Sequence, residues 1–139
     1  MGIVHRDLKA RNVLVAPESR AVLIDFGLAC HTTQDSPEWI SRTVGTKKYR
    51  PPEMRDGRPA QPASDLYCFG LMIEKLLRQR ERASVSNSPS SDTARAERRD
   101  CRVLNEVVAH CTCRDPANRM SAWQAVSYTH LTLPTILLV

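Results

Sequence analysis

Residue types that could do chemistry stand close together near the start of the chain, in the run VHRDLKARNVLV at residues 4–15. Asp7 offers a carboxylate that can accept a proton, and Lys9 offers a positive charge two residues later. Asn12 offers an amide oxygen, a ligand type that Mg²⁺ accepts. Together they could form a site that moves a proton beside a negatively charged group. Alone, the same three residues would equally describe an ordinary surface cluster.

Further motifs in a fixed order decide between these two interpretations. The opening run matches H-R-D-L-K-x-x-N, the catalytic loop of protein kinases, at every fixed position. Other landmarks of that family follow: Asp25-Phe26-Gly27, GTKKYRPPE at 45–53, Asp65 with Gly70, and DPANR at 115–119. Two positions depart from the family pattern, with Pro51 in place of Ala and Tyr67 in place of Trp. The chain therefore resembles the eukaryotic-type protein kinase domain from residue 3 to about residue 125.

The resemblance indicates the serine/threonine type of kinase. Lys9 agrees with that type, and so does Thr46, which in such kinases contacts the catalytic Asp and Lys. The run Ala10-Arg11-Asn12 has some tyrosine-kinase character, so dual specificity stays open. The run Val44–Tyr49 is similar to the corresponding segment of the tyrosine-kinase-like group of serine/threonine kinases.

The resemblance also implies a role for each residue of the site. Asp7 would orient the substrate hydroxyl and accept its proton, and Lys9 would steady the transferring phosphate. Asn12 and Asp25 would bind Mg²⁺, which prefers hard oxygen ligands. Thr46 would position the substrate. The implied activity is ATP-dependent phosphoryl transfer to Ser or Thr hydroxyls of a protein substrate, with ATP and Mg²⁺ as cofactors.

Arg6 implies regulation, because an Arg beside the catalytic Asp in this family pairs with a phosphate on the activation segment, here residues 25–53. A phosphate adds about −1.5 to −2 charges and can bind Arg bidentately. Ser41 and Thr43 are the best-placed acceptors, although each is read equally well as an unmodified loop residue. The phosphate would come from an upstream activating kinase or from autophosphorylation.

Other residues are expected to support the site without reacting: His5, Phe26, Gly27, Glu53, Asp65 and Arg119. Glu53 and Arg119 should form a buried ion pair that ties the activation segment to the helical lobe, and breaking such a pair costs about 3–5 kcal/mol. Asp65 should accept hydrogen bonds from the backbone of the catalytic loop. His5 should pack and hydrogen-bond, and is not the base. Gly27 gives the Asp-Phe-Gly turn its backbone freedom.

The apolar pattern predicts an α+β, mainly α fold, which is the large lobe of a kinase with a short β-hairpin after the catalytic loop. Val13–Val15 and Ala21–Ile24 flank a polar turn and predict that hairpin. A Ser64/Asp65 cap predicts a buried helix over 65–80. Residues 27–50 lack sustained periodicity and are expected to form a long surface segment. Two more helices, separated by the DPANR turn, are expected at about 101–113 and 121–126.

The expected organisation is one partial kinase domain over residues 1–125, with a Ser-rich linker at about 83–94. None of the five glycines forms G-x-G-x-x-G, and nothing resembles V-A-I-K, so we expect the nucleotide-binding N-terminal lobe to be absent. The run VSYTHLTLPT at 126–135 is similar to a translated transposase sequencing adaptor, so residues 126–139 are expected to be an artefact. Such a fragment would be inactive alone; the alternative is a non-catalytic, kinase-like fragment that binds or interferes.

Composition disfavours several other classes of protein. The net charge of +5 is mild, so no nucleic-acid partner is expected, and no apolar run reaches membrane-spanning length. Five cysteines without a secretory signal favour reduced thiols, and hence an intracellular, cytoplasmic location unless the full-length protein is anchored to a membrane. His110, Cys111 and Cys113 could ligate a metal, but no second ligand pair is evident, so small buried thiols are the favoured interpretation.

Overall fold

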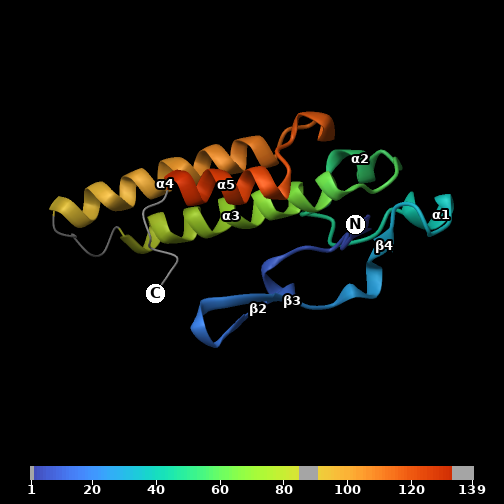
Figure 1. Ribbon diagram of the computed structural model, residues 1–139, viewed down its shortest axis with the longest axis horizontal. Coiled ribbons are helices and arrows are strands. Elements are labelled where there is room, and N and C mark those ends of the chain that lie inside the picture. Colours follow the sequence, from blue (N-terminus) through green and yellow to red (C-terminus); the bar gives the residue numbers. More distant parts are fainter. Residues whose placement is uncertain (1, 85–90, 133–139) are drawn as a thin grey trace.

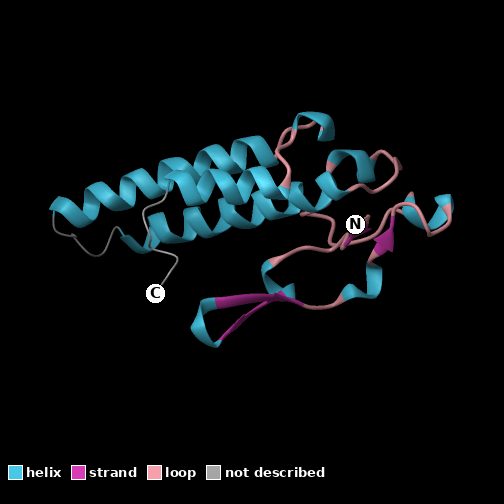
Figure 2. Ribbon diagram, viewed as in Figure 1, coloured by secondary structure: helices cyan, strands magenta, loops and turns pink. Residues whose placement is uncertain are grey.

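The computed structural model describes residues 2–84 and 91–132 (Figure 1). Helices dominate it, and the strands are short (Figure 2), in agreement with the predicted mainly α fold of a kinase large lobe. The strands are β1 (Ile3–Val4), β2 (Val13–Ala16), β3 (Arg20–Leu23) and β4 (Cys30–His31). The helices are α1 (Pro37–Ile40), α2 (Pro52–Arg55), α3 (Pro62–Ser84), α4 (Ser91–Cys111) and α5 (Ala122–Thr132).

The three long helices α3, α4 and α5 lie side by side, with α4 in contact with both others (Figure 1). Gly70 lets α3 approach the end of α4 closely. A Cβ at that position would lie 2.8 Å from the Cys111 Cβ and 2.8 Å from the Thr112 Cγ2. The glycine thus allows α3 to pack against the end of α4.

The predicted hairpin is confirmed. Strands β2 and β3 pair antiparallel with Val13 opposite Leu23 and Ala16 opposite Arg20. Glu18, in the turn between them, has a positive φ of 62°. The hairpin projects away from the long helices (Figure 1), and the side chains of Leu14 and Val15 are exposed. Its function in the fold is to return the chain from Asn12 to Asp25.

The expectation that residues 27–50 run along the surface is wrong in part. Within this segment β4 pairs with β1, and the side chains of Cys30, Ile40 and Tyr49 are buried. Cys30 and Ile40 pack in one core cluster with Val4, Met54 and Ala60, whereas Tyr49 packs in another with Leu8 and Cys68. Each short element buries a single apolar side chain, so the sequence has no repeating apolar pattern that would predict this burial.

Helix α3 begins at Pro62, ahead of the predicted cap, and extends to Ser84. The predicted capping residues serve other partners. The Ser64 hydroxyl donates to Glu53, and the Asp65 carboxylate accepts from the backbone of His5 and Arg6. The expectation that this helix is buried also needs correction, because Leu76 is 49% exposed.

Parts of the predicted linker and of the predicted artefact are helical. Helix α3 ends at Ser84 and α4 begins at Ser91, so of the linker expected at 83–94 only residues 85–90 fall between helices, and these lie outside the described residues. Helix α5 continues through residue 126 to Thr132, and residues 133–139 lie outside the described part. The adaptor origin of residues 126–139 stays a prediction.

Candidate functional site

The loop that follows β1 is buried and fixed from below by α3. The side chains of His5, Arg6, Asp7 and Leu8 are all buried. The Asp65 carboxylate accepts hydrogen bonds from the backbone N–H of His5 at 2.6 Å and of Arg6 at 3.0 Å. These bonds hold Arg6 at a φ of 65°, a conformation that is uncommon for a residue other than glycine. The loop geometry is therefore imposed by tertiary contacts and not by local preference.

Asp7, Lys9 and Thr46 form a hydrogen-bonded set. The Lys9 Nζ lies 2.5 Å from the Asp7 Oδ2 and donates to the Thr46 Oγ1 at 3.0 Å. The Thr46 backbone N–H donates to the other carboxylate oxygen, Oδ1, at 2.7 Å. The chain thus brings together three of the predicted site residues across a sequence separation of 39 positions.

The pKa of Asp7 lies below its usual value. Burial acts to raise this pKa, but the hydrogen bonds from Lys9 and Thr46, together with the Lys9 charge, outweigh burial. Asp7 is therefore an ionised carboxylate at neutral pH. Such a group can accept a hydrogen bond, and then a proton, from a hydroxyl placed beside it.

Gly45 and Arg50 complete this arrangement, and neither stood among the predicted site residues. Gly45 has a φ of +82°, and a Cβ there would overlap the Arg6 carbonyl oxygen. Arg50 donates to the carbonyl oxygens of Val44 at 2.9 Å and Gly45 at 2.7 Å. Together they hold the Thr46 backbone against the loop that carries Asp7. The signal that could have found Gly45 is its fixed place one residue before Thr46 in the quoted motif.

Asn12 lies on the same side of the loop as Asp7. Its buried side chain donates from Nδ2 to the Asp7 backbone carbonyl at 3.0 Å and to the Asp7 Oδ2 at 3.4 Å. Its own backbone carbonyl accepts from the Ile24 N–H at 3.0 Å. The amide nitrogen is therefore committed to Asp7, and the amide oxygen is the atom left for a cation.

The turn Asp25-Phe26-Gly27 follows β3 directly. The His5 Nε2 lies 3.0 Å from the Ile24 carbonyl oxygen, and the His5 and Phe26 rings lie 4.8 Å apart. Asp25 has a positive φ of 65° and an exposed side chain that makes no hydrogen bond or ion pair within residues 2–84 and 91–132. The turn is thus joined to the loop through Ile24 and His5, while the Asp25 carboxylate stays open.

The expected ion pair between Glu53 and Arg119 is formed and fully buried. Arg119 donates to both carboxylate oxygens of Glu53 at 2.7 Å, and the Ser64 hydroxyl donates to Glu53 at 2.8 Å. Further Arg119 bonds reach the backbone carbonyls of Cys113 and Ala63. Burial acts to raise the pKa of Glu53, but the bonds from Arg119 and Ser64 leave it below the usual value.

The side chains of the predicted regulatory residues Arg6 and Thr43 bond residues other than Asp7. The guanidinium of Arg6 is buried, donates to the carbonyl oxygens of Leu28 at 2.6 Å and Trp39 at 2.5 Å, and stacks 4.5 Å from the Trp39 ring. Its NH2 nitrogen is buried without a partner in the described chain. Thr43 is exposed and donates to the Met54 carbonyl, whereas Ser41 ends helix α1.

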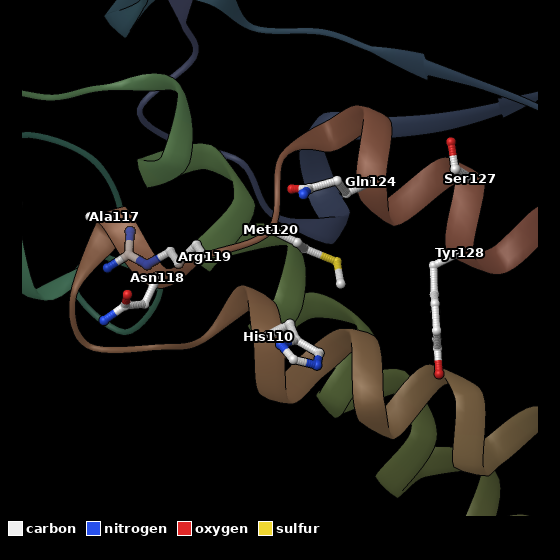
Figure 3. Close-up of a pocket in the computed structure, with 8 residues that line it drawn as sticks. All are labelled: His110, Ala117, Asn118, Arg119, Met120, Gln124, Ser127 and Tyr128. Carbon is white, nitrogen blue, oxygen red and sulfur yellow. The ribbon is translucent and has the colours of Figure 1, made fainter.

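A separate hollow of about 570 Å³ lies between the end of α4, the loop after it and α5 (Figure 3). His110, Met120 and Gln124 line it, and Tyr128 extends from α5 toward α4, where its hydroxyl donates to Glu106. Arg119 borders this hollow, but its guanidinium is committed to Glu53. The hollow includes none of the predicted catalytic or metal-binding residues.

Two other sequence expectations concern metals and membranes. Within the described residues, no group of three or more His, Cys, Asp or Glu side chains could hold a metal ion, so His110, Cys111 and Cys113 form no such cluster. All five cysteines are free thiols. Among the described helices, none has the length and apolar character needed to cross a bilayer.

The sequence is similar to known protein kinases. Residues 1–131 match the family described as Protein kinase domain. The chain is 34% identical to eukaryotic translation initiation factor 2-alpha kinase 1 of Rattus norvegicus, over 89% of this chain and 23% of that protein. It is 40% identical to LysM domain receptor-like kinase 10 of Oryza sativa subsp. japonica, over 63% of this chain and 14% of that protein.

A third relative is a probable LIM domain-containing serine/threonine-protein kinase of Dictyostelium discoideum, 30% identical over 87% of this chain and 19% of that protein. This chain therefore spans less than a quarter of the length of each of these relatives. The family match covers Asp7, Thr46 and Arg119, the residues around which the site is built. On this match, the chain belongs to the protein kinase domain family.

Proposed function

We propose that the protein containing this chain transfers a phosphoryl group from ATP to serine or threonine hydroxyls of a protein substrate. The observation that carries the proposal is the set in which Lys9 bonds both Asp7 and Thr46 while the Thr46 backbone bonds Asp7. This set fixes an ionised acceptor and a cation side by side in a buried loop. Phosphoryl transfer requires those two groups in fixed positions.

The proposed step uses Asp7 and Lys9 directly. The substrate hydroxyl donates to Asp7, its oxygen forms a bond to the transferred phosphorus, and the bond from that phosphorus to the leaving oxygen breaks. The hydroxyl proton passes to the Asp7 carboxylate. Lys9 offsets the negative charge on the transferring group. Thr46, which holds Asp7 through its backbone, keeps the acceptor oriented toward the substrate.

The oxygen donors beside Asp7 fit Mg²⁺. The Asn12 amide oxygen is left over once its nitrogen has bonded Asp7, and the Asp25 carboxylate is exposed without a partner in the described chain. Amide and carboxylate oxygens are hard ligands of the kind that Mg²⁺ prefers. Mg²⁺ bound there would neutralise charge on the phosphates of ATP.

Three narrower proposals accompany this function. Residues 1–125 form the substrate-binding lobe, and this chain alone is inactive, since its 139 residues contain no G-x-G-x-x-G. Phosphorylation of Ser41 or Thr43, by an upstream kinase or by the protein itself, regulates the site, and the unpartnered NH2 of Arg6 supports this assignment. The free cysteines support action inside the cell, in the cytoplasm.

The test compares the full-length protein with the 139-residue chain, each incubated with Mg²⁺-ATP and a mixture of protein substrates. We expect phosphoserine and phosphothreonine from the full-length protein and no incorporation from the chain alone. Asp7→Asn should lower kcat by about 10²–10⁴-fold. The matched control is Lys75→Gln, an exposed position on α3, which should keep the wild-type rate.

Several outcomes would contradict the proposal. Incorporation that survives Asp7→Asn in the full-length protein would remove Asp7 from the reaction. Phosphotyrosine as the sole product would overturn the serine/threonine specificity. A full-length protein that transfers no phosphate to any substrate would favour the alternative of a non-catalytic binding module. Asp7-dependent incorporation by the 139-residue chain would overturn its proposed inactivity.

A further inference from the structure

Four cations line an open hollow of about 620 Å³ on the segment that follows Thr46. Lys47, Lys48 and Arg50 come from that segment, and Arg55 comes from helix α2. Among the described residues, no Asp or Glu lines the hollow. Like charges held this close repel one another, so an arrangement of four cations is stabilised by any anion that enters it.

The nearby carboxylates do not neutralise this cluster. Glu53, on the same helix as Arg55, is buried in its pair with Arg119. Asp56, next to Arg55, pairs with Arg58 at 3.4 Å. Lys47, Lys48 and Arg55 are exposed and form no ion pair within the described residues, although Lys48 lies 5.2 Å from the centre of the Tyr49 ring. The positive charge is therefore available to a ligand from outside.

Hydrogen bonds connect the segment that lines the hollow to the proposed reaction centre. Lys47 follows Thr46, whose backbone N–H is bonded to Asp7 at 2.7 Å. Arg50 both lines the hollow and bonds the carbonyl oxygens of Val44 and Gly45, so it fixes the segment that contacts the catalytic loop. Lys47 is thus one residue from a backbone group that contacts Asp7, so the hollow lies next to the group that would meet the substrate hydroxyl.

We propose that this cationic hollow binds an anionic side chain of the protein substrate, within a few residues of the phosphorylated Ser or Thr. The anion is either a carboxylate or a phosphate already present on the substrate. This inference rests on the proposed kinase function, because it takes its geometry from Asp7 as the group that meets the substrate hydroxyl. It makes the protein selective for acidic or previously phosphorylated substrates.

The experiment measures peptide binding and phosphorylation separately in the full-length protein. Three fluorescein-labelled serine peptides carry alanine, glutamate or phosphoserine at the positions flanking the target serine. Fluorescence anisotropy gives Kd without requiring catalysis, and kinase assays give kcat/KM for the same peptides. We expect the glutamate peptide, the phosphoserine peptide or both to bind about tenfold tighter than the alanine peptide, as several exposed charge pairs would allow.

The variants reverse the charge inside and outside the hollow. The double variant Lys47→Glu/Arg55→Glu should bind the anionic and alanine peptides with nearly equal Kd. Lys75→Glu, at an exposed position on α3, should keep the tenfold difference. Arg50 is left intact because it holds the Gly45 backbone. Lys47→Gln with Arg55→Gln provides the same comparison should the reversed charges disturb folding, which circular dichroism would reveal.

The outcomes separate this proposal from the function on which it rests. Tighter binding of an anionic peptide that depends on Lys47 and Arg55 supports the proposed anion site, even if no phosphate is transferred. An absence of phosphate transfer would then count against the kinase function alone. Equal Kd values for the alanine and anionic peptides overturn the proposal, whatever the kinase assay shows. So does an equal loss in the Lys75→Glu protein, or displacement by a DNA duplex as effective as displacement by the acidic peptide, because both indicate unspecific attraction of polyanions.

Discussion

The loop around Asp7 and the turn at Asp25 both contribute to the candidate site, and the protein holds them in different ways. In the loop, Asp7 bonds Lys9, Thr46 and Asn12, and the backbone beneath it is bonded to Asp65. In the turn, Phe26 is 52% exposed and the Asp25 side chain has no partner among the described residues.

The backbone of Ile24 connects these two regions. Its N–H donates to the Asn12 carbonyl and its carbonyl oxygen lies 3.0 Å from the His5 Nε2. The side chain of the next residue, Asp25, makes no hydrogen bond or ion pair with any described residue. The position of the turn is therefore set by the loop, while the Asp25 carboxylate is free to bind something else.

The difference distinguishes groups that are already fixed in position before a ligand binds, such as Asp7, from groups that gain a partner only when a ligand binds, such as Asp25. Fixed dipoles and charges contribute most to catalysis when they need no reorganisation during the reaction, and the Asp7 set meets that condition. A metal ligand must instead exchange water for the ion, so an exposed carboxylate is suitable. Four predictions test how firmly the protein holds the loop, the segment that reaches Asp7 and the open turn.

The largest effect should come from the ion pair that anchors α2, the helix that follows the segment reaching Asp7. Arg119→Leu leaves Glu53 buried without its partner, and we expect a loss of about 3–5 kcal/mol in the free energy of unfolding. Arg58→Leu removes the partner of exposed Asp56 and should cost less than about 1 kcal/mol. Urea unfolding followed by tryptophan fluorescence measures both, and similar losses would show that the buried pair does not anchor α2.

A second, smaller effect compares one carboxylate from each region. Asp65→Ala leaves the backbone N–H groups of His5 and Arg6 without an acceptor, which should cost about 3 kcal/mol. Asp25→Ala removes a side chain with no partner in the described chain, so only the strain of alanine at a φ of 65° acts, and it should cost less than about 1 kcal/mol. Equal costs in urea titrations would break the comparison, because the turn would then be as firmly held as the loop.

The third prediction concerns the contact between Gly45 and the Arg6 carbonyl. Gly45→Ala places a methyl group against that oxygen at a φ of +82°, so both overpacking and backbone strain act. Gly57→Ala is the matched control, since its φ is +70° but no atom of the described residues lies within 4 Å of the added carbon. We expect Gly45→Ala to lower the unfolding free energy by about 2 kcal/mol more than Gly57→Ala. Identical melting temperatures for the two variants would contradict a close approach at Gly45.

The sequence predicts local features of this molecule best. The hairpin follows from two apolar runs around a polar turn, and the membership of Asp7, Lys9 and Asn12 in one loop follows from their spacing. The link between Asp7 and Thr46 could be expected only from the family resemblance, since 39 positions separate the two residues.

The errors arise where a side chain serves a distant partner. Ser64 and Asp65 have the residue types of a helix cap, yet α3 begins earlier, at Pro62. The Ser64 hydroxyl instead bonds Glu53, a partner that the sequence did not indicate, whereas the bonds from the loop backbone to Asp65 were expected from the family resemblance. Likewise, the four cations of the hollow are scattered over nine positions, from Lys47 to Arg55, and only the folded segment gathers them. Spacing along the chain carries no information on such contacts.

The smallest predicted effect is a dependence of stability on pH that arises from Glu53. Since its pKa is lowered in the folded protein, the unfolded chain binds its proton more readily, and stability falls as pH decreases through the usual value of 4.5 and below. Asp7 acts in the same direction, whereas Asp65, whose pKa is raised by burial, acts in the opposite one. The total curve therefore mixes several groups, and only a difference between two proteins isolates Glu53.

Glu53→Gln provides that difference, because glutamine keeps the shape and does not titrate. Between about pH 6 and pH 3, wild type should lose stability relative to the variant by up to about 1.4 kcal/mol per pH unit, the limit for one proton. Above about pH 6 the two curves should run parallel, with the variant less stable, because its neutral amide leaves the buried Arg119 uncompensated. Urea titrations at each pH measure both parts. Parallel curves over the whole range would mean that Glu53 binds its proton equally in the folded and unfolded chain, and the anchoring assigned to its ionised pair with Arg119 would then be wrong.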